Sequence, residues 1–186
     1  LVMTLGFGQM FALLSSSQQI YDEIFDMADS FPLWFALMAL LAASATVINS
    51  MTVLRLGMRK LVTWAYLGQI AIVAVYLVLV LGDLLPEALK FPAYFIWSVS
   101  VFFMAGITFG NLNALAMQYM GHVAGMAASI IAGLSTVGAV LIAAPIGLMF
   151  NGTPVPAAAG GFGIELPSWL GLFIALGVAC LIGVFT

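Results

Sequence analysis

The feature that most constrains this chain is a series of long apolar stretches that contain almost no charged side chains. Each is about 20 residues long or longer, the length that an α-helix needs to cross the hydrocarbon core of a bilayer. The stretches cover residues 1–20, 32–52, 61–81, 91–117, 123–150 and 166–186. Because they are continuously apolar and do not alternate, they favour helices over the strands of a barrel. The sequence therefore predicts an all-α membrane protein, with one six-helix transmembrane domain over residues 1–186.

Composition agrees with a lipid environment. Hydrophobic residues make up 65% of the chain and charged residues only 6%, whereas a soluble domain has about 25% charged residues. The net charge of -3 is spread over a few side chains and offers no basic stripe, so we expect no nucleic-acid partner. The bilayer itself is the expected partner of most of the surface.

The orientation follows from the basic residues between the apolar stretches. Arg55, Arg59 and Lys60 lie in one short link, and clustered basic residues mark the cytoplasmic side of a membrane protein. Alternation of the predicted helices then places the link with Asp83 and Lys90 outside and both ends of the chain inside. An acidic segment also falls outside: Asp22, Glu23, Asp26 and Asp29.

The sequence lacks the patterns on which common enzymatic sites depend. It contains no glycine-rich phosphate loop, no HExxH pair and no GxSxG elbow. Cys180 is the only cysteine, so neither an internal disulfide nor a thiolate metal site can form. We therefore expect no enzyme activity, no cofactor and no metal ion.

The basic link carries the first candidate motif, which consists of Arg55, Gly57, Arg59 and Lys60. On charge alone it is a loop that sets topology. It also resembles the repeated cytoplasmic loop of the major facilitator superfamily, whose pattern is Gly-x-x-x-Asp-Arg-x-Gly-Arg-Arg/Lys. Ser50 and Leu54 stand at the first glycine and the aspartate. This departure resembles the degenerate copy in the second half of that fold.

Further segments are similar to the Bcr/CflA drug-efflux branch of the same superfamily. The run from Phe109 to Met117, the run from Gly121 to Ser129 and the start of the chain around Ser15–Ser17 and Tyr21 carry the similarity. The resemblance implies that the chain is the carboxyl-terminal half of a transporter, helices seven to twelve, built as a three-plus-three inverted repeat. The missing partner would be an amino-terminal six-helix half.

Polar residues inside apolar helices are the candidate substrate-binding residues, because burying them in lipid is costly. They are Ser15, Ser16, Gln18 and Tyr21 in the first segment and Asn111 and Asn113 in the fourth. Gln18 and Tyr21 are three residues apart and are expected to share a helix face. The alternative is structural: hydrogen bonds between helices, hydroxyls bonded to their own helix, and Tyr21 in an interfacial aromatic belt.

The favoured function is transport of small organic compounds, as proton-coupled multidrug efflux by alternating access across a bacterial inner membrane. Two alternatives stay open: a major facilitator carrier for sugars or metabolites, and a membrane fragment that does not transport. No acidic or basic residue lies well inside any of the predicted spans. A proton-coupling group, which normally must lie within the membrane, is therefore expected in the other half.

Overall fold

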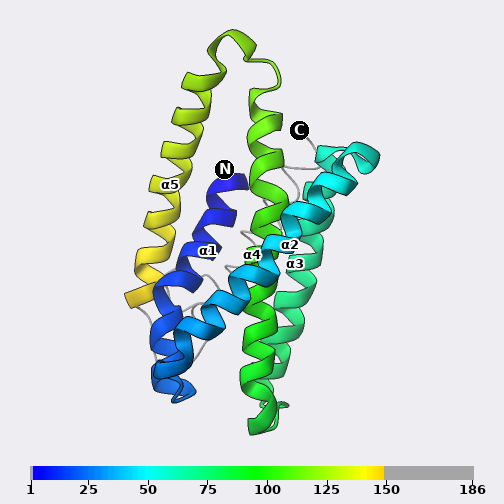
Figure 1. Ribbon diagram of the computed structural model, residues 1–186. Coiled ribbons are helices and arrows are strands. Elements are labelled where there is room, and N and C mark those ends of the chain that lie inside the picture. Colours follow the sequence, from blue (N-terminus) through cyan, green and yellow to red (C-terminus); the bar gives the residue numbers. More distant parts are fainter. Residues whose placement is uncertain (1, 149–186) are drawn as a thin grey trace.

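The computed structural model describes residues 2–148, and over this range the chain is built from helices (Figure 1). The long helices are α1 (Val2–Gln19), α2 (Phe31–Leu56), α3 (Met58–Leu81), α4 (Glu87–Met117) and α5 (Ala124–Leu148). A π-helical turn, Ile20–Ile24, continues α1, and short 3-10 turns, Ala28–Ser30 and Gly121–Val123, precede α2 and α5. The predicted segment at 166–186 and the link before it lie outside the described residues.

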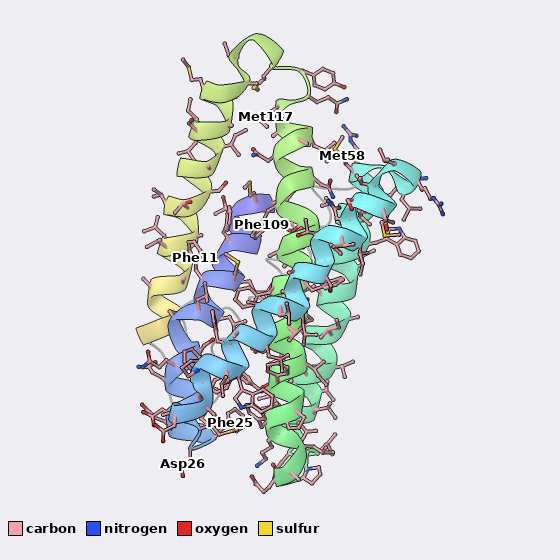
Figure 2. The ribbon with its side chains drawn as sticks, in the orientation of Figure 1. Phe11, Phe25, Asp26, Met58, Phe109 and Met117 are labelled. Carbon is pink, nitrogen blue, oxygen red and sulfur yellow. The ribbon has the colours of Figure 1, made fainter. Side chains whose placement is uncertain are left out.

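The helices run up and down, so that successive connections lie at alternating ends of the bundle. Asp26 lies at one end, and Met58 and Met117 lie toward the other (Figure 2). The most extensive contacts between helices join α1 to α5, α2 to α4 and α3 to α4. The acidic connection after α1 and the link between α3 and α4 therefore share one end, while the basic turn at Gly57 lies at the opposite end.

Four of the described helical segments are long and apolar enough to cross a membrane: Ala28–Leu56, Met58–Leu81, Glu87–Met117 and Ala124–Leu141. Their outer faces are apolar as well, with Leu54 90% exposed and Trp64 74% exposed. In water such faces would be an aggregation liability, whereas in a bilayer they contact lipid. Length and composition thus indicate an integral membrane protein, as predicted.

Helix α1 is the exception among the predicted spans that the structure describes. It is not one of the four candidate membrane spans, because its 18 residues include Gln9, Gln18, Gln19 and the serines at 15–17. Side chains of this kind are costly in lipid and are expected to face protein or a water-filled cavity. The α1 helix therefore depends on its neighbours for its place in the bundle.

Small residues allow the helices to approach one another closely. A Cβ atom at Gly138 of α5 would lie 2.5 Å from the Thr4 Cγ2 of α1, and one at Gly106 of α4 would lie 3.0 Å from the Ala45 Cβ of α2. Such contacts are how membrane helices associate, because lipid tails leave no hydrophobic driving force between them. The contacts of α1 with α5 and of α2 with α4 are both built in this way.

The core lies where α1, α3 and α4 meet and is rich in aromatic residues. Tyr21, Tyr66, Tyr76, Tyr94 and Trp97 are all at most 4% exposed. Toward the acidic end, further rings from the start of α2 and α4 surround Tyr21: Phe31, Trp34 and Phe91 are partly buried against this cluster. Ring contacts at 5 to 6 Å stabilise such clusters beyond simple burial of area.

The turn between α2 and α3 is a single residue, shorter than the predicted link. Arg55 lies in the last turn of α2, and Arg59 and Lys60 lie in the first turn of α3. Gly57 has φ +80° and ψ 151°, a conformation that is essentially restricted to glycine. Gly57 therefore permits the tight reversal between the two helices.

Replacing Gly57 with alanine should therefore destabilise the protein by about 1 to 2 kcal/mol, because a Cβ atom disfavours this backbone conformation. Thermal unfolding in detergent micelles measures the effect. Gly68→Ala is the matched control: Gly68 lies inside α3, its added Cβ would meet nothing within 4 Å, and alanine is the better helix former. Equal stability of the two variants would contradict the assigned turn.

Candidate functional site

The candidate site is an open face of α1, defined by Leu14, Ser15, Gln18 and Gln19, all of which are exposed. These positions follow the spacing of one side of a helix. On the opposite side of α1, Gln9 is 4% exposed and Ser16 is 1% exposed. A single helix thus has one side packed into the bundle and one polar side that no described element covers.

Neighbouring helices contact α1 beside this open face and further along the helix. Beside the face, α5 packs against α1 through Ala12 and Ala143. About two helical turns before Leu14, the Phe7 ring of α1 lies 4.2 Å from the Phe109 ring of α4. A ligand at the open face would therefore meet two amides and one hydroxyl, with apolar and aromatic side chains further along α1, a combination typical of sites for small organic molecules.

The predicted residues of α1 do not all lie on the open face. Ser15 and Gln18 do, and the Ser15 hydroxyl donates to the Ala12 carbonyl at 2.9 Å, as the structural alternative predicted. Ser16 points into the bundle, and its buried hydroxyl has no hydrogen-bond partner there. The open face ends at Ser15, because the next residue of the helix is already turned toward the bundle, so the structure brings together Ser15 and Gln18 but not Ser16.

Tyr21 belongs to the core. Its side chain is 2% exposed, and its ring makes edge contacts with Phe31 at 5.1 Å, Phe91 at 5.6 Å and Tyr94 at 5.9 Å. The structure therefore does not bring Tyr21 to the open face beside Gln18. The α-helical spacing that the pairing assumed is also lost, because Tyr21 lies in the π-helical turn Ile20–Ile24, which repeats after a longer interval than an α-helix.

Asn111 joins two helices. Its side-chain Nδ2 donates to Asn49 Oδ1 of α2 at 2.6 Å and to the Ile107 carbonyl at 2.8 Å, and the residue is 5% exposed. This is the interhelical hydrogen bond of the structural alternative. Asn113 is two residues away and partly buried, and its Oδ1 has no hydrogen-bond partner. The two asparagines thus point in different directions from α4.

Replacing Asn111 with leucine should destabilise the bundle by about 0.6 to 1.7 kcal/mol, the range for hydrogen bonds between membrane helices, because Asn49 loses its partner. Denaturation of the Asn49→Leu, Asn111→Leu and double variants forms a cycle, in which the double variant should lose less than the sum. Asn113→Leu is the control on the same helix. Strictly additive losses would show that the two amides do not interact.

The sequence reasoning missed three amides: Gln9 of α1, Asn49 of α2 and Gln69 of α3. Gln9 is buried with neither amide atom bonded, and the Nε2 of Gln69 is also buried without a partner. Buried polar groups of this kind call for an explanation such as ordered water. The available signal was the same as for Asn111, an amide within an apolar helix.

The basic turn presents its cations to the surroundings. Arg55, Arg59 and Lys60 are exposed. None makes an ion pair with another described residue, because the ion pairs in this part of the chain join Lys90 to Asp83 and Glu87. Arg59 and Lys60 lie at the amino end of α3, where the helix dipole disfavours positive charge. Helix stability therefore does not explain their position.

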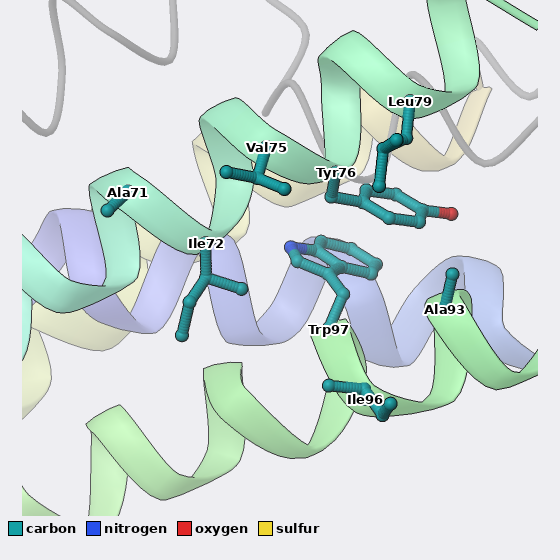
Figure 3. A pocket seen from close by; sticks show the side chains of 8 residues that line it. All are labelled: Ala71, Ile72, Val75, Tyr76, Leu79, Ala93, Ile96 and Trp97. Carbon is teal, nitrogen blue, oxygen red and sulfur yellow. The ribbon is translucent and has the colours of Figure 1, made fainter. Parts of the chain in front are cut away.

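A second hollow lies on the opposite side of α4, in a groove between α3 and α4 with a volume of 390 Å³. Figure 3 shows its lining: Ala71, Ile72, Val75, Tyr76, Leu79, Ala93, Ile96 and Trp97. The Tyr76 and Trp97 rings stack at its floor, with centroids 5.2 Å apart and an interplanar angle of 4°. This groove contains no residue of the predicted site.

Within residues 2–148, no group of three or more histidine, cysteine, aspartate or glutamate residues is close enough to hold a metal ion. Comparison with known proteins gives no match: no family model, no curated protein and no solved structure is similar to this chain.

Proposed function

We propose that this chain is the carboxyl-terminal half of a major facilitator transporter, with six membrane helices, and that it moves small organic compounds across the membrane by alternating access. The observation that carries the proposal is the open polar face of α1, where Ser15 and Gln18 are exposed in a helix whose other side is buried. An exposed amide in the membrane is stable only beside water or another protein surface. A second bundle facing α1 across a water-filled cavity supplies both.

The helix contacts support the three-plus-three repeat. In such a repeat α1 corresponds to α4 and α2 corresponds to α5, so a contact of α1 with α5 should have a counterpart in a contact of α4 with α2. Both pairs make extensive contacts in the described bundle. Repeats of this kind carry the substrate site near the midplane, at the interface between the repeats.

The charges support an orientation in a bacterial inner membrane with both chain ends on the cytoplasmic side. Arg55, Arg59 and Lys60 lie at the end of the bundle opposite to Asp26, Asp29 and Glu87. Basic groups near a membrane end favour the cytoplasmic side and are attracted to its anionic lipids. This attraction also accounts for two cations at a helix amino end, where the dipole opposes them.

The favoured activity is proton-coupled efflux of amphipathic compounds, because the open face carries two amides, a hydroxyl and an apolar side chain and no fixed charge. The test is reconstitution of the complete transporter in proteoliposomes, with a panel of amphipathic dyes and of sugars. Dye movement that requires a proton gradient is the expected result. Sugar flux that is independent of the gradient would identify a metabolite carrier, and the absence of any flux would identify a module that does not transport.

A further inference from the structure

The groove between α3 and α4 opens sideways, toward the surroundings of the bundle. All eight lining side chains are apolar or aromatic, and Ile72, Val75 and Ile96 are among the exposed apolar residues of the described surface. Both α3 and α4 are candidate membrane spans. At this depth the surrounding medium is hydrocarbon, so the group that reaches the groove is an acyl chain of a lipid.

The dimensions of the groove suit one leaflet. On α3 the lining runs from Ala71 to Leu79, which is about 12 Å of helix axis at 1.5 Å per residue. One leaflet contributes roughly 15 Å of hydrocarbon. An empty groove would forfeit the dispersion contacts of its walls, and we therefore expect a chain to fill it. Because lipid tails are as apolar as leucine, the chain itself gives little preference among lipids.

The preference must come from the polar end of the groove, where three charged residues lie together. Lys90 is one and two helical turns from Ala93 and Trp97 on the same side of α4, so it lies just beyond the groove, toward the membrane surface. Its Nζ atom is 2.6 Å from Glu87 Oε1 and 4.0 Å from Asp83 Oδ1. This ammonium therefore lies where a lipid headgroup would be.

The charge pattern selects one kind of headgroup. Lys90 has three N–H donors, of which one is bonded to Glu87, so it can also donate to a phosphate. The two carboxylates outnumber the single ammonium, and their side chains are 88% and 89% exposed. They disfavour a purely anionic lipid and accept hydrogen bonds from a primary amine. The headgroup of phosphatidylcholine cannot donate such a hydrogen bond, because choline has no N–H.

We propose that the α3–α4 groove and the Asp83, Glu87 and Lys90 cluster form a binding site for a phospholipid with a zwitterionic primary-amine headgroup, such as phosphatidylethanolamine. One acyl chain lies along the stacked Tyr76 and Trp97 rings (Figure 3). The phosphate accepts from Lys90, and the headgroup amine donates to Glu87 and Asp83. The site is independent of transport, because it lies on a different side of the bundle from the open face of α1.

The test uses the fluorescence of Trp97 in a protein whose other tryptophans, Trp34, Trp64 and Trp169, are replaced by phenylalanine. The protein is reconstituted in phosphatidylcholine vesicles, and lipids with brominated acyl chains are added as contact quenchers. Brominated phosphatidylethanolamine should quench Trp97 with about threefold higher relative affinity than brominated phosphatidylcholine, as expected for one exposed charge interaction. The emission maximum of Trp97 reports that each variant is folded.

Two variants identify the residues responsible. Glu87→Gln should reduce the preference for phosphatidylethanolamine and raise the relative affinity of phosphatidylglycerol, because the cluster loses its excess negative charge. Glu23→Gln is the matched control, since Glu23 is exposed in the turn after α1 and should change neither value. Ala93→Phe should fill the groove and lower quenching by every lipid.

Three results would overturn the proposal. Equal quenching by all three lipids would mean that the groove meets only bulk lipid. No quenching by any lipid would mean that protein covers the groove, either a second copy or another segment. An equal effect of Glu23→Gln and Glu87→Gln would mean that general surface charge sets the preference.

Discussion

Replacing Gly138 with leucine should separate α5 from α1 and destabilise the protein by about 3 kcal/mol, the upper range for overpacking a close contact. Even a Cβ atom at this position would lie 2.5 Å from Thr4 Cγ2, and leucine adds three further carbons. Since α1 is not one of the four apolar spans, its position depends on this contact. Denaturation in detergent micelles, followed by circular dichroism, measures the loss.

Two further variants separate this contact from a general effect of substitution in α5. Gly133→Leu lies on the same helix, is exposed, and would place its Cβ where nothing lies within 4 Å, so its stability should be close to that of the unmodified protein. Thr4→Ala removes the obstructing methyl group and should make Gly138→Ala less harmful than it is alone. The account of the α1–α5 contact fails if Gly133→Leu and Gly138→Leu are equally unstable.

Replacing Ser15 with tryptophan should abolish transport while leaving the fold intact. Ser15 is exposed on the open face, and its hydroxyl bonds only to the Ala12 carbonyl of its own helix, so the bundle loses no contact between helices. The indole would occupy the space proposed for the substrate. We expect more than about a tenfold fall in the initial rate of dye transport, which corresponds to at least 1.4 kcal/mol.

Val78→Trp is the control for this substitution. Val78 is 63% exposed on α3, a candidate membrane span that does not belong to the open face of α1, and a tryptophan there should leave the rate near its original value. Thermal unfolding of both variants shows whether either loses its fold. A fully active Ser15→Trp protein would remove the open face from the transport path.

Much of the described fold could be predicted from the sequence because long apolar runs have few alternatives in lipid. The predicted segments at 32–52 and 61–81 lie within α2 and α3. The sequence could not reveal that the link between them is one glycine, because helix ends depend on backbone conformation and not on hydropathy. It also could not reveal the π-helical turn after α1, which continues the helix to Ile24.

The sequence could predict which residue types form the candidate site, but not the direction in which each side chain points. The sequence marks Ser15, Gln18 and Asn111 as polar groups in apolar surroundings, but a group of this kind is equally suited to a cavity and to a helix contact. Asn111 bonds to Asn49, whose role depends on how α2 crosses α4. Tyr21 turns toward Phe31 and Phe91 because the backbone changes its repeat at that point. The crossing of two helices decides the first outcome, and the local backbone repeat decides the second.

Cysteine accessibility in intact membranes tests most directly whether α1 lines a water-filled path through a membrane bundle. The Cys180→Ser background leaves no other thiol in these 186 residues, and Gln18→Cys and Val75→Cys are then compared for reaction with a membrane-impermeant maleimide. Both positions are exposed on the described bundle, so they should react alike in a water-soluble protein. We predict that Gln18→Cys is labelled and Val75→Cys is not, because water reaches only the open face of α1. Equal labelling of both, or labelling of Val75→Cys alone, would contradict this account.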